Sequence, residues 1–180
     1  MESIVKTKWA VDPTHSEVQF KVKHLVISTV TGAFKVFSGS LETENEDFTN
    51  AIIEFSLDVN SIDTNQEQRD EHLKSADFFD AGKFPEIKFK STSFEKDGDD
   101  YKLLGGLTIK DVTKPVKLDV EFGGSATDFY GNLKAGFEIS GKINRKDYGL
   151  VWSGITEAGA IVVGEDIKIS INLQFAKQDS

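Results

Sequence analysis

The segment DPTHSEVQFKVKHLV, residues 12–26, alternates apolar and polar side chains almost without error. Val18, Phe20, Val22 and His24 share one parity, and the positions between them are charged or polar. Successive side chains of a β-strand point to opposite faces, so this period of two predicts a strand with one apolar face. His15 has the opposite parity, and the two imidazoles are therefore expected to point in opposite directions.

The same alternation recurs along the rest of the chain, with turn residues between the copies. It is found in AIIEFSLDV, PEIKFKSTSF, YKLLGGLTI, PVKLDVEF, NLKAGFEISGKI and DIKISINLQF. Together with the weaker runs TKWAV and GAFKVFSGSLE, the pattern predicts about eight or nine strands. Because only one face of each strand is apolar, the strands are expected to be antiparallel with a solvated outer face.

One stretch alone has a helical pattern, TNQEQRDEHLKS, for which Thr64 and Glu67 suggest a capping box. The strands follow one another through mostly local turns such as KDGDD, which favours a closed barrel over a sandwich. The sequence thus predicts an all-β fold: a single up-and-down antiparallel β-barrel of about eight strands, lipocalin-like, with one helix inserted around residues 64–75. Residues 1–180 are expected to form one domain.

A barrel of about eight strands is either just filled by side chains or just able to hold one small ligand. The chain has 14 Phe but only 3 Tyr and 2 Trp, and several of the Phe have inward parity. These rings either fill the barrel or line a slot for an apolar chain. Gly105 and Gly141 also have inward parity, where they either leave space or relieve strand coiling.

Two polar residues of inward parity require partners, because a buried polar group without one is costly. His24 is one, and Arg145 in KINRKDYG is the other. A buried Arg needs a carboxylate, for which Asp147 and Asp12 are the candidates by position. A structural ion pair that closes one barrel end is the favoured interpretation, and direct contact with a ligand head group is the alternative.

Charge and composition exclude several classes of function. The 21 basic and 30 acidic residues give a net charge of −9, which repels a nucleic-acid backbone on average. There is no Cys, and the three His stand apart without metal-ligand or nucleophile-elbow spacing. The sequence therefore predicts no catalytic site, no metal and no required cofactor.

The start of the chain, MESIVKTKWAVD, lacks the apolar stretch of a signal peptide, and no later segment is long enough to span a membrane. As written, the chain is expected in the cytoplasm. A trimmed mature form of a periplasmic protein would look similar.

Four ordered motifs resemble the YceI-like family of lipid- or polyisoprenoid-binding proteins. They are DPTHSEVQFKVKHLVISTVTGAF, NSIDTNQEQRDEHLKSADFFDAGKFPEIKF, GGLTIKDVTKPVKL and INRKDYGLVW, and the resemblance runs from about Trp9 to Phe175. It implies a lipocalin-like barrel with an apolar tunnel for an isoprenoid quinone, a polyprenyl chain, a fatty acid or amide, or a similar amphiphile. It also implies that SADFFDAGKFP packs over the barrel as a lid or side wall. Many relatives carry a secretion leader, which this chain does not show.

The expected ligand-lining residues combine inward parity with this resemblance. They are Phe20, Val22, His24, Phe34, Phe55, Phe89, Leu107, Ile109, Phe137, Ile139 and Trp152. Asp12, Arg145 and Asp147 are expected to be polar or structural residues at the barrel end.

The leading hypothesis is a non-enzymatic binder of a long-chain amphiphile such as an isoprenoid lipid or quinone, which serves storage, transport or sequestration, for example under stress. Two alternatives remain open. One is a barrel enzyme of the isomerase or cyclase type that acts on such a lipid. The other is a filled barrel that acts as a protein interaction module. An unpaired edge or an exposed strand face could also support a homodimer.

Overall fold

A computed structural model describes residues 6–24, 28–44, 48–150 and 163–178. Its strands are β1 Thr7–Val11, β2 Glu17–His24, β3 Ser28–Phe34, β4 Phe37–Thr43, β5 Ile52–Asp58, β6 Ile62–Asp63, β7 Glu86–Asp97, β8 Asp100–Ile109, β9 Val112–Thr127, β10 Leu133–Asn144 and β11 Val163–Lys177. One α-helix, α1 Glu67–Lys74, accompanies three short 3₁₀ turns, η1 Pro13–His15, η2 Val59–Ser61 and η3 Arg145–Tyr148.

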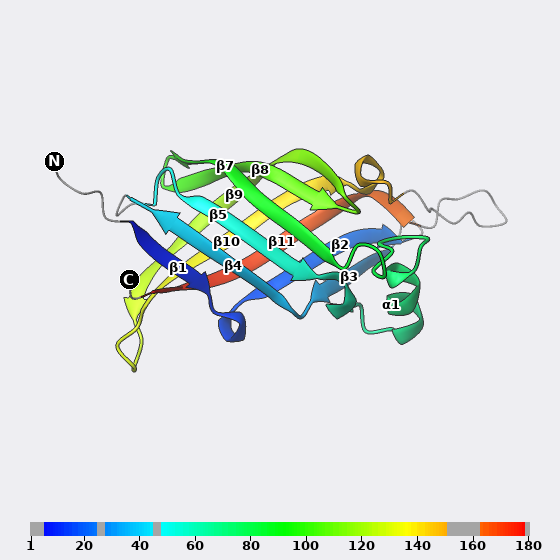
Figure 1. The fold of residues 1–180 in the computed structure, drawn as a ribbon, viewed down its shortest axis with the longest axis horizontal. Coiled ribbons are helices and arrows are strands. Elements are labelled where there is room, and N and C mark those ends of the chain that lie inside the picture. Colours follow the sequence, from blue (N-terminus) through cyan, green and yellow to red (C-terminus); the bar gives the residue numbers. More distant parts are fainter. Residues whose placement is uncertain (1–5, 25–27, 45–47, 151–162, 179–180) are drawn as a thin grey trace.

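The strands form a closed antiparallel barrel (Figure 1). Neighbours in the sheet follow the chain from β4 through β5, β7, β8, β9 and β10 to β11, and β1 closes the wall by pairing with both β4 and β11. Three wall strands are each broken into two segments, β1 with β2, β3 with β4 and β5 with β6, so the eleven described segments make an eight-stranded wall. The predicted up-and-down barrel is confirmed.

The break between β1 and β2 lets one edge of β11 serve both segments. β1 pairs with the C-terminal end of β11, where Trp9 lies opposite Lys177, and β2 pairs with the preceding part, where Phe20 lies opposite Ile169. At the other end of the barrel, β6 pairs with β3 and contacts α1. The helix thus lies beside the wall at the end where β6 takes over from β5 (Figure 1).

The helix was predicted in the right place, but its capping box was wrong. The N-cap is Gln66, without a side-chain cap bond, and the helix begins at Glu67. Thr64 instead lies before the helix, where its amide and hydroxyl both donate to the Asp70 carboxylate, at 2.9 and 2.5 Å. A carboxylate inside the first turn therefore fixes the chain that leads into the helix.

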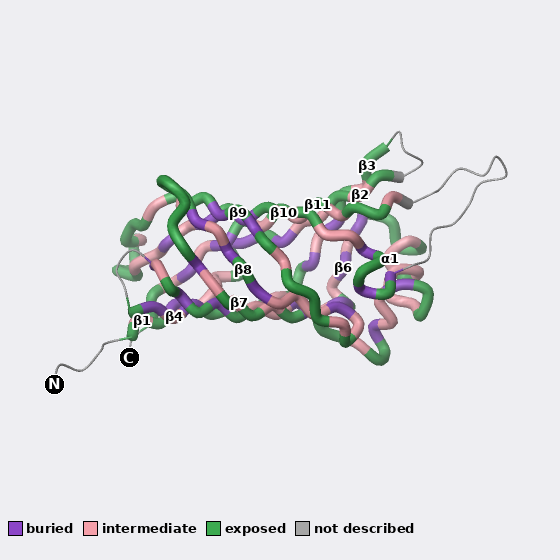
Figure 2. Tube along the Cα trace, turned by 90° about the horizontal axis from the view of Figure 1, so that it is seen from above, coloured by how far each residue is buried: buried purple, intermediate pink, exposed green. Residues whose placement is uncertain are grey.

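The buried residues fall into two clusters along the barrel axis, which the purple segments of Figure 2 trace on the strands. One cluster lies at the end where β1 begins, and it contains Trp9, Leu41, Phe94 and Phe175. The other lies at the end that carries α1. Its members include Val59, Phe78, Tyr148 and Leu150, which come from the connections between strands.

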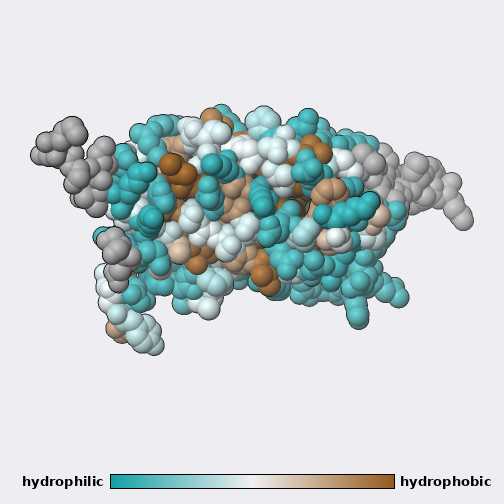
Figure 3. Space-filling view, in the orientation of Figure 1, coloured by the Kyte–Doolittle hydropathy of each residue, from teal (hydrophilic) through white to brown (hydrophobic). Residues whose placement is uncertain are grey.

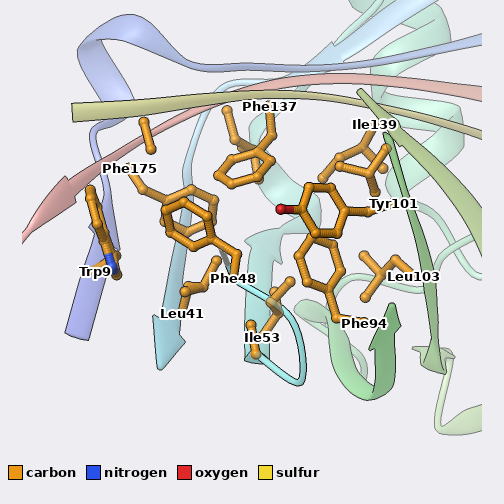
Figure 4. Packing of buried hydrophobic residues seen from close by; sticks show 14 of the residues in the cluster. Trp9, Leu41, Phe48, Ile53, Phe94, Tyr101, Leu103, Phe137, Ile139 and Phe175 are labelled. Atoms are coloured by element: carbon orange, nitrogen blue, oxygen red, sulfur yellow. The ribbon is translucent and has the colours of Figure 1, made fainter. Parts of the chain in front are cut away.

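Aromatic rings fill the first end of the barrel, and we call them the aromatic plug. They are Trp9, Phe48, Phe94, Tyr101, Phe122, Phe137 and Phe175. Figure 4 shows most of these rings converging inside the wall. Phe94 stacks on Tyr101 with centroids 4.6 Å apart, and Phe137 contacts Phe48 edge-on at 5.4 Å. Such rings bury large areas and gain further from edge-to-face contact.

Phe48 enters the aromatic plug from the connection between β4 and β5. Its φ is +66°, a conformation that costs a non-glycine residue energy unless its surroundings hold it there. The ring packs against Trp9 at 5.3 Å, Phe122 at 5.6 Å and Phe137 at 5.4 Å. Packing in the aromatic plug thus offsets the backbone strain of the connection.

The outer surface is largely hydrophilic in the view of Figure 3, with scattered apolar residues. Charged side chains of neighbouring strands pair across it, as Lys90 and Glu54 do at 3.7 Å. Exposed pairs of this kind contribute little to stability. In the described part of the chain, no helix has the length and apolar character to cross a bilayer.

We expect Phe137→Ala to lower the free energy of unfolding by about 3–5 kcal/mol, because it removes a ring that is 4% exposed and touches four other rings of the plug. Denaturant unfolding measures the change. Phe129 is fully exposed, so Phe129→Ala is the matched control and should stay within about 0.5 kcal/mol of the parent. Equal effects of the two substitutions would contradict this account of the plug.

Candidate functional site

A cavity of about 530 Å³ occupies the half of the barrel nearer α1. Its volume lies within the range of about 300–1,000 Å³ that is typical of pockets for a single small ligand. Most of its wall is apolar and comes from inward positions of the strands. Among the residues predicted from the sequence, it is lined by Phe20, Val22, Phe34, Phe55, Phe89, Leu107, Ile109 and Ile139.

The floor of the cavity separates it from the aromatic plug. Ile53, Leu103, Ile139 and Leu173 line the cavity and also border a void of about 10 Å³ on the plug side. A void of that size is at the lower limit for one water molecule. The cavity therefore ends at these four aliphatic side chains, and the barrel is hollow on one side of them and filled on the other.

The opposite end of the cavity is lined by α1 and the segment after it. Arg69, His72 and Leu73 come from the helix, and Phe78 and Phe79 follow it. The expectation that SADFFDAGKFP packs over the barrel agrees with these positions. Parity could not have identified these residues, because they lie outside the strands and α1 has a single Leu as its apolar signal.

Polar side chains gather at this helical end, and hydrogen bonds hold them. The Arg69 guanidinium donates from Nε to Thr64 Oγ1 at 2.8 Å and from Nη2 to the Thr64 carbonyl at 2.5 Å. His72 Nε2 lies 3.0 Å from Asp77 Oδ2, and its ring meets Phe78 edge-on at 5.4 Å. Gln66 and Gln68 also line this end. The cavity is thus largely apolar, and polar side chains gather where α1 borders it.

Three of the predicted lining residues are not placed on the cavity. Phe137 has inward parity, as expected, but lies in the aromatic plug and borders the small void beyond the floor. The structure thus places Phe137 outside the larger cavity. Trp152 lies outside the described residues, and His24 is described only through its backbone at the end of β2.

Arg145 borders the cavity and is 1% exposed, as its parity predicted. Its Nε donates to the Gly164 carbonyl at 2.7 Å and its Nη1 to the Leu150 carbonyl at 2.5 Å. Burial lowers the pKa of the guanidinium from its ordinary value, and the charge of Glu165 acts in the opposite direction. Arg remains protonated even so, and the residue joins η3 to the start of β11.

Asp12 is not the partner of Arg145, which corrects one candidate ion pair. The carboxylate lies between β1 and β2, where Oδ2 accepts from Lys134 Nζ at 2.8 Å, and both side chains are less than one fifth exposed. Lys134 and Arg145 stand at opposite ends of β10, roughly 35 Å apart at about 3.3 Å per residue. The pair Asp12–Lys134 thus fastens the bend of the first wall strand to β10 at the plug end.

Asp12 also accepts hydrogen bonds within the bend between β1 and β2. It accepts from the Thr14 amide at 3.0 Å and the Thr14 hydroxyl at 2.6 Å, and His15 Nδ1 lies 3.0 Å away. The bond from Lys134, followed by those from Thr14 and His15, holds the pKa of the carboxyl well below its usual range.

Asp147, the third predicted polar residue, is exposed in η3. Its neighbour Tyr148 is 2% exposed, and burial, together with the charge of Asp147, raises the pKa of the phenol to about 12. The ring is therefore neutral at physiological pH and packs in the cluster at the α1 end. Asp147 itself follows the C-terminal end of β10.

The described residues include no group of three or more His, Cys, Asp or Glu that could hold a metal ion. What the described geometry offers is a largely apolar cavity with hydrogen-bonding side chains where α1 borders it. Such an arrangement suits a molecule with an apolar chain and a polar terminus.

Comparison with known proteins relates the chain to one family. The sequence profile of the YceI-like domain matches residues 9–175. A UPF0312 protein of Pectobacterium atrosepticum is 37% identical over 164 residues, which cover 91% of this chain and 82% of the relative. The crystal structure of Campylobacter jejuni YceI protein is 33% identical with a TM-score of 0.73, covering 87% of this chain and 90% of that one.

A second solved structure agrees in fold at lower identity. It is described as a polyisoprenoid binding domain from Saccharophagus degradans, and it shares 16% identity and a TM-score of 0.68 over 94% of this chain and 98% of that one. At this identity the likeness establishes the barrel fold alone.

We expect Asp12→Asn to lower the free energy of unfolding at neutral pH by about 1–3 kcal/mol, because it removes a charge-assisted bond to Lys134. The pKa of Asp12 is lower in the folded chain than in the unfolded one, so its contribution is present above about pH 4. It is lost as the pH falls further toward the folded pKa. When the free energy of unfolding is measured from pH 7 to 2, it should therefore fall less steeply below pH 4 in the variant than in the parent.

The exposed Asp99 provides the control for this experiment. Asp99→Asn should follow the parent curve at every pH. An Asp12→Asn variant with the parent's acid dependence would show that the carboxylate does not stabilise the fold.

Proposed function

The chain belongs to the YceI-like family, and from this premise we propose that its barrel binds one long-chain amphiphilic lipid, of the isoprenoid class, within the cavity. The observation that carries the proposal is the largely apolar cavity of about 530 Å³, with polar side chains gathered where α1 borders it. The name of the Saccharophagus degradans domain, which refers to polyisoprenoid binding, supports the choice of ligand class.

The size of the cavity sets the length of chain that it can hold. A methylene group is about as large as a water molecule, whose share of liquid volume is about 30 Å³, so the cavity takes roughly 15 to 18 carbon atoms. Each buried CH₂ contributes about 0.8 kcal/mol, and a dozen of them contribute about 10 kcal/mol before the cost of association. Apolar contact is thus the main source of the proposed affinity.

The polar terminus of the lipid is proposed to lie at the α1 end, near Arg69 and His72. Both side chains border the cavity there and already take part in hydrogen bonds with Thr64 and Asp77. At the other end, Ile53 and Leu173 belong to the aliphatic floor, where a polar group would lose its hydration without compensation. The ligand therefore enters with its chain directed toward the aromatic plug.

The proposed role is to store, carry or sequester this lipid without converting it. The hollow half of the barrel argues against the alternative of a completely filled interaction module. Native mass spectrometry of the purified chain, followed by organic extraction, tests the binding directly. We expect one amphiphile per chain, or uptake of one equivalent when an isoprenoid quinone or alcohol is added. A homogeneous unliganded chain that refuses every added lipid would overturn the proposal.

Chemical identity of the recovered molecule separates binding from catalysis. An added ligand that is released unchanged after incubation fits a carrier, whereas a converted product would support the barrel enzyme.

We expect Phe20→Asp to abolish lipid retention, because it places an unpaired carboxylate in the apolar wall of the cavity. The variant's fold is checked by circular dichroism, and its bound lipid by native mass spectrometry. Val36→Asp puts the same group at a position that is 59% exposed, and this control should keep its lipid. A folded Phe20→Asp variant with full lipid occupancy would place the ligand elsewhere.

A further inference from the structure

Three phenylalanines of the cavity wall lie beside glycines of the neighbouring strand. Phe20 of β2 is directly opposite Gly32 of β3, and Phe55 of β5 is opposite Gly39 of β4. Phe89 of β7 is opposite Leu107 of β8, and Gly105, two residues before Leu107, is in a diagonal position. Cross-strand neighbours at these spacings are within reach of an aromatic ring.

The rings lie directly over these glycines. A Cβ atom placed on Gly32 would overlap Phe20, with Cε1 and Cε2 only 2.7 and 2.9 Å away and Cζ closer still. On Gly39 it would lie 2.6 Å from Phe55 Cδ2, and on Gly105 2.5 Å from Phe89 Cζ. Each phenyl ring thus occupies the space that a side chain on the next strand would take.

The position of the rings has a direct effect on the lumen. A ring that covers a glycine lies along the wall, whereas a ring displaced by a methyl group must turn toward the barrel axis. Ordinary contact begins near 3.4 Å, so alanine at position 32 would move the Phe20 ring by about 1 Å. The shift narrows the slot beside Phe20.

Gly32 offers the cleanest case of the three. The three atoms nearest to its added Cβ all belong to the Phe20 ring, which can rotate. At Gly39 and Gly105 the main-chain oxygens of Glu54 and Lys90 lie in the way as well, at 3.2 and 2.5 Å. Substitution at those two positions would therefore strain the wall itself, in addition to moving a ring.

We propose that Gly32 is a specificity-determining residue: by letting the Phe20 ring lie flat on the wall, it gives the cavity the width that a methyl-branched isoprenoid chain requires. The inference rests on the proposed lipid binding and refines it. Straight alkyl chains need less width, so they should be less sensitive to the residue at position 32.

The test compares farnesol with dodecanol, two alcohols whose main chains have equal length but only one of which carries methyl branches. Each is titrated into the parent chain and into Gly32→Ala, and the bound fraction is read by native mass spectrometry. We expect Gly32→Ala to lower the affinity for farnesol at least about tenfold relative to the affinity for dodecanol. Adding Phe20→Leu to this variant removes the displaced ring and should restore farnesol binding.

Gly136 of β10 provides the matched control. It also lies within a strand, but an added Cβ there meets no atom within 4 Å, so Gly136→Ala should bind both alcohols as the parent does. Thermal unfolding verifies that every variant is folded.

The outcomes separate this inference from the proposed function. Suppose that the parent chain binds dodecanol or farnesol. If Gly32→Ala then shows no selective loss of farnesol binding, or if Phe20→Leu does not restore that binding, the role of Gly32 is overturned but the proposed function is not. A parent chain that binds neither alcohol and yields no lipid on extraction overturns the proposed function and the role of Gly32 with it.

A second comparison serves if Gly32→Ala alone does not fold. Phe20→Leu and the double variant Phe20→Leu/Gly32→Ala should then bind farnesol equally, because no ring is left to displace. Weaker binding by a folded double variant would show that Gly32 acts through something other than Phe20, and would overturn the inference.

Discussion

The width of an eight-stranded lumen is the constraint on which the rest of this structure depends. The pairing of β1 with both β4 and β11 closes the wall, and an eight-stranded wall leaves an interior that side chains can only just fill. In this barrel the two halves of the interior differ in how far side chains fill them. The aromatic plug fills one half, and in the other half the rings of Phe20, Phe55 and Phe89 lie along the wall and leave about 530 Å³ open.

Parity along the strands was sufficient to predict which residues face the lumen, but not which half of it they face. Phe137 and Ile139 are neighbours on one face of β10, yet Phe137 belongs to the plug and Ile139 to the cavity floor. The depth of a residue depends on the register and tilt of the strands, which its sequence period does not encode. The contribution of Phe48 was beyond prediction for a different reason, since it comes from a connection with a positive φ.

The polar residues show a similar limit. The buried position of Arg145 followed from its parity, but its identified partners include the carbonyls of Gly164 and Leu150, and main-chain groups leave no compositional signal. Likewise, Thr64 looked like a helix cap because it precedes Glu67 by three residues, yet its hydrogen bonds go to Asp70. In both cases the sequence offers several groups that could form the same hydrogen bond. Only the three-dimensional path of the chain determines which of them does so.

The glycines opposite the wall phenylalanines connect these observations to function. Glycine in a strand weakens it, and the sequence left open whether such residues make space or relieve coiling. At Gly105, one of the two glycines in question, the Phe89 ring takes the space that a side chain would fill, as Phe20 and Phe55 do at Gly32 and Gly39, and the lumen beside them stays free. A barrel that had only to be stable could place larger side chains at these positions and fill its interior. The hollow half lacks such larger side chains at these positions, although the plug beside it is built from tightly packed rings. This contrast indicates that the sequence maintains the open volume at the expense of packing.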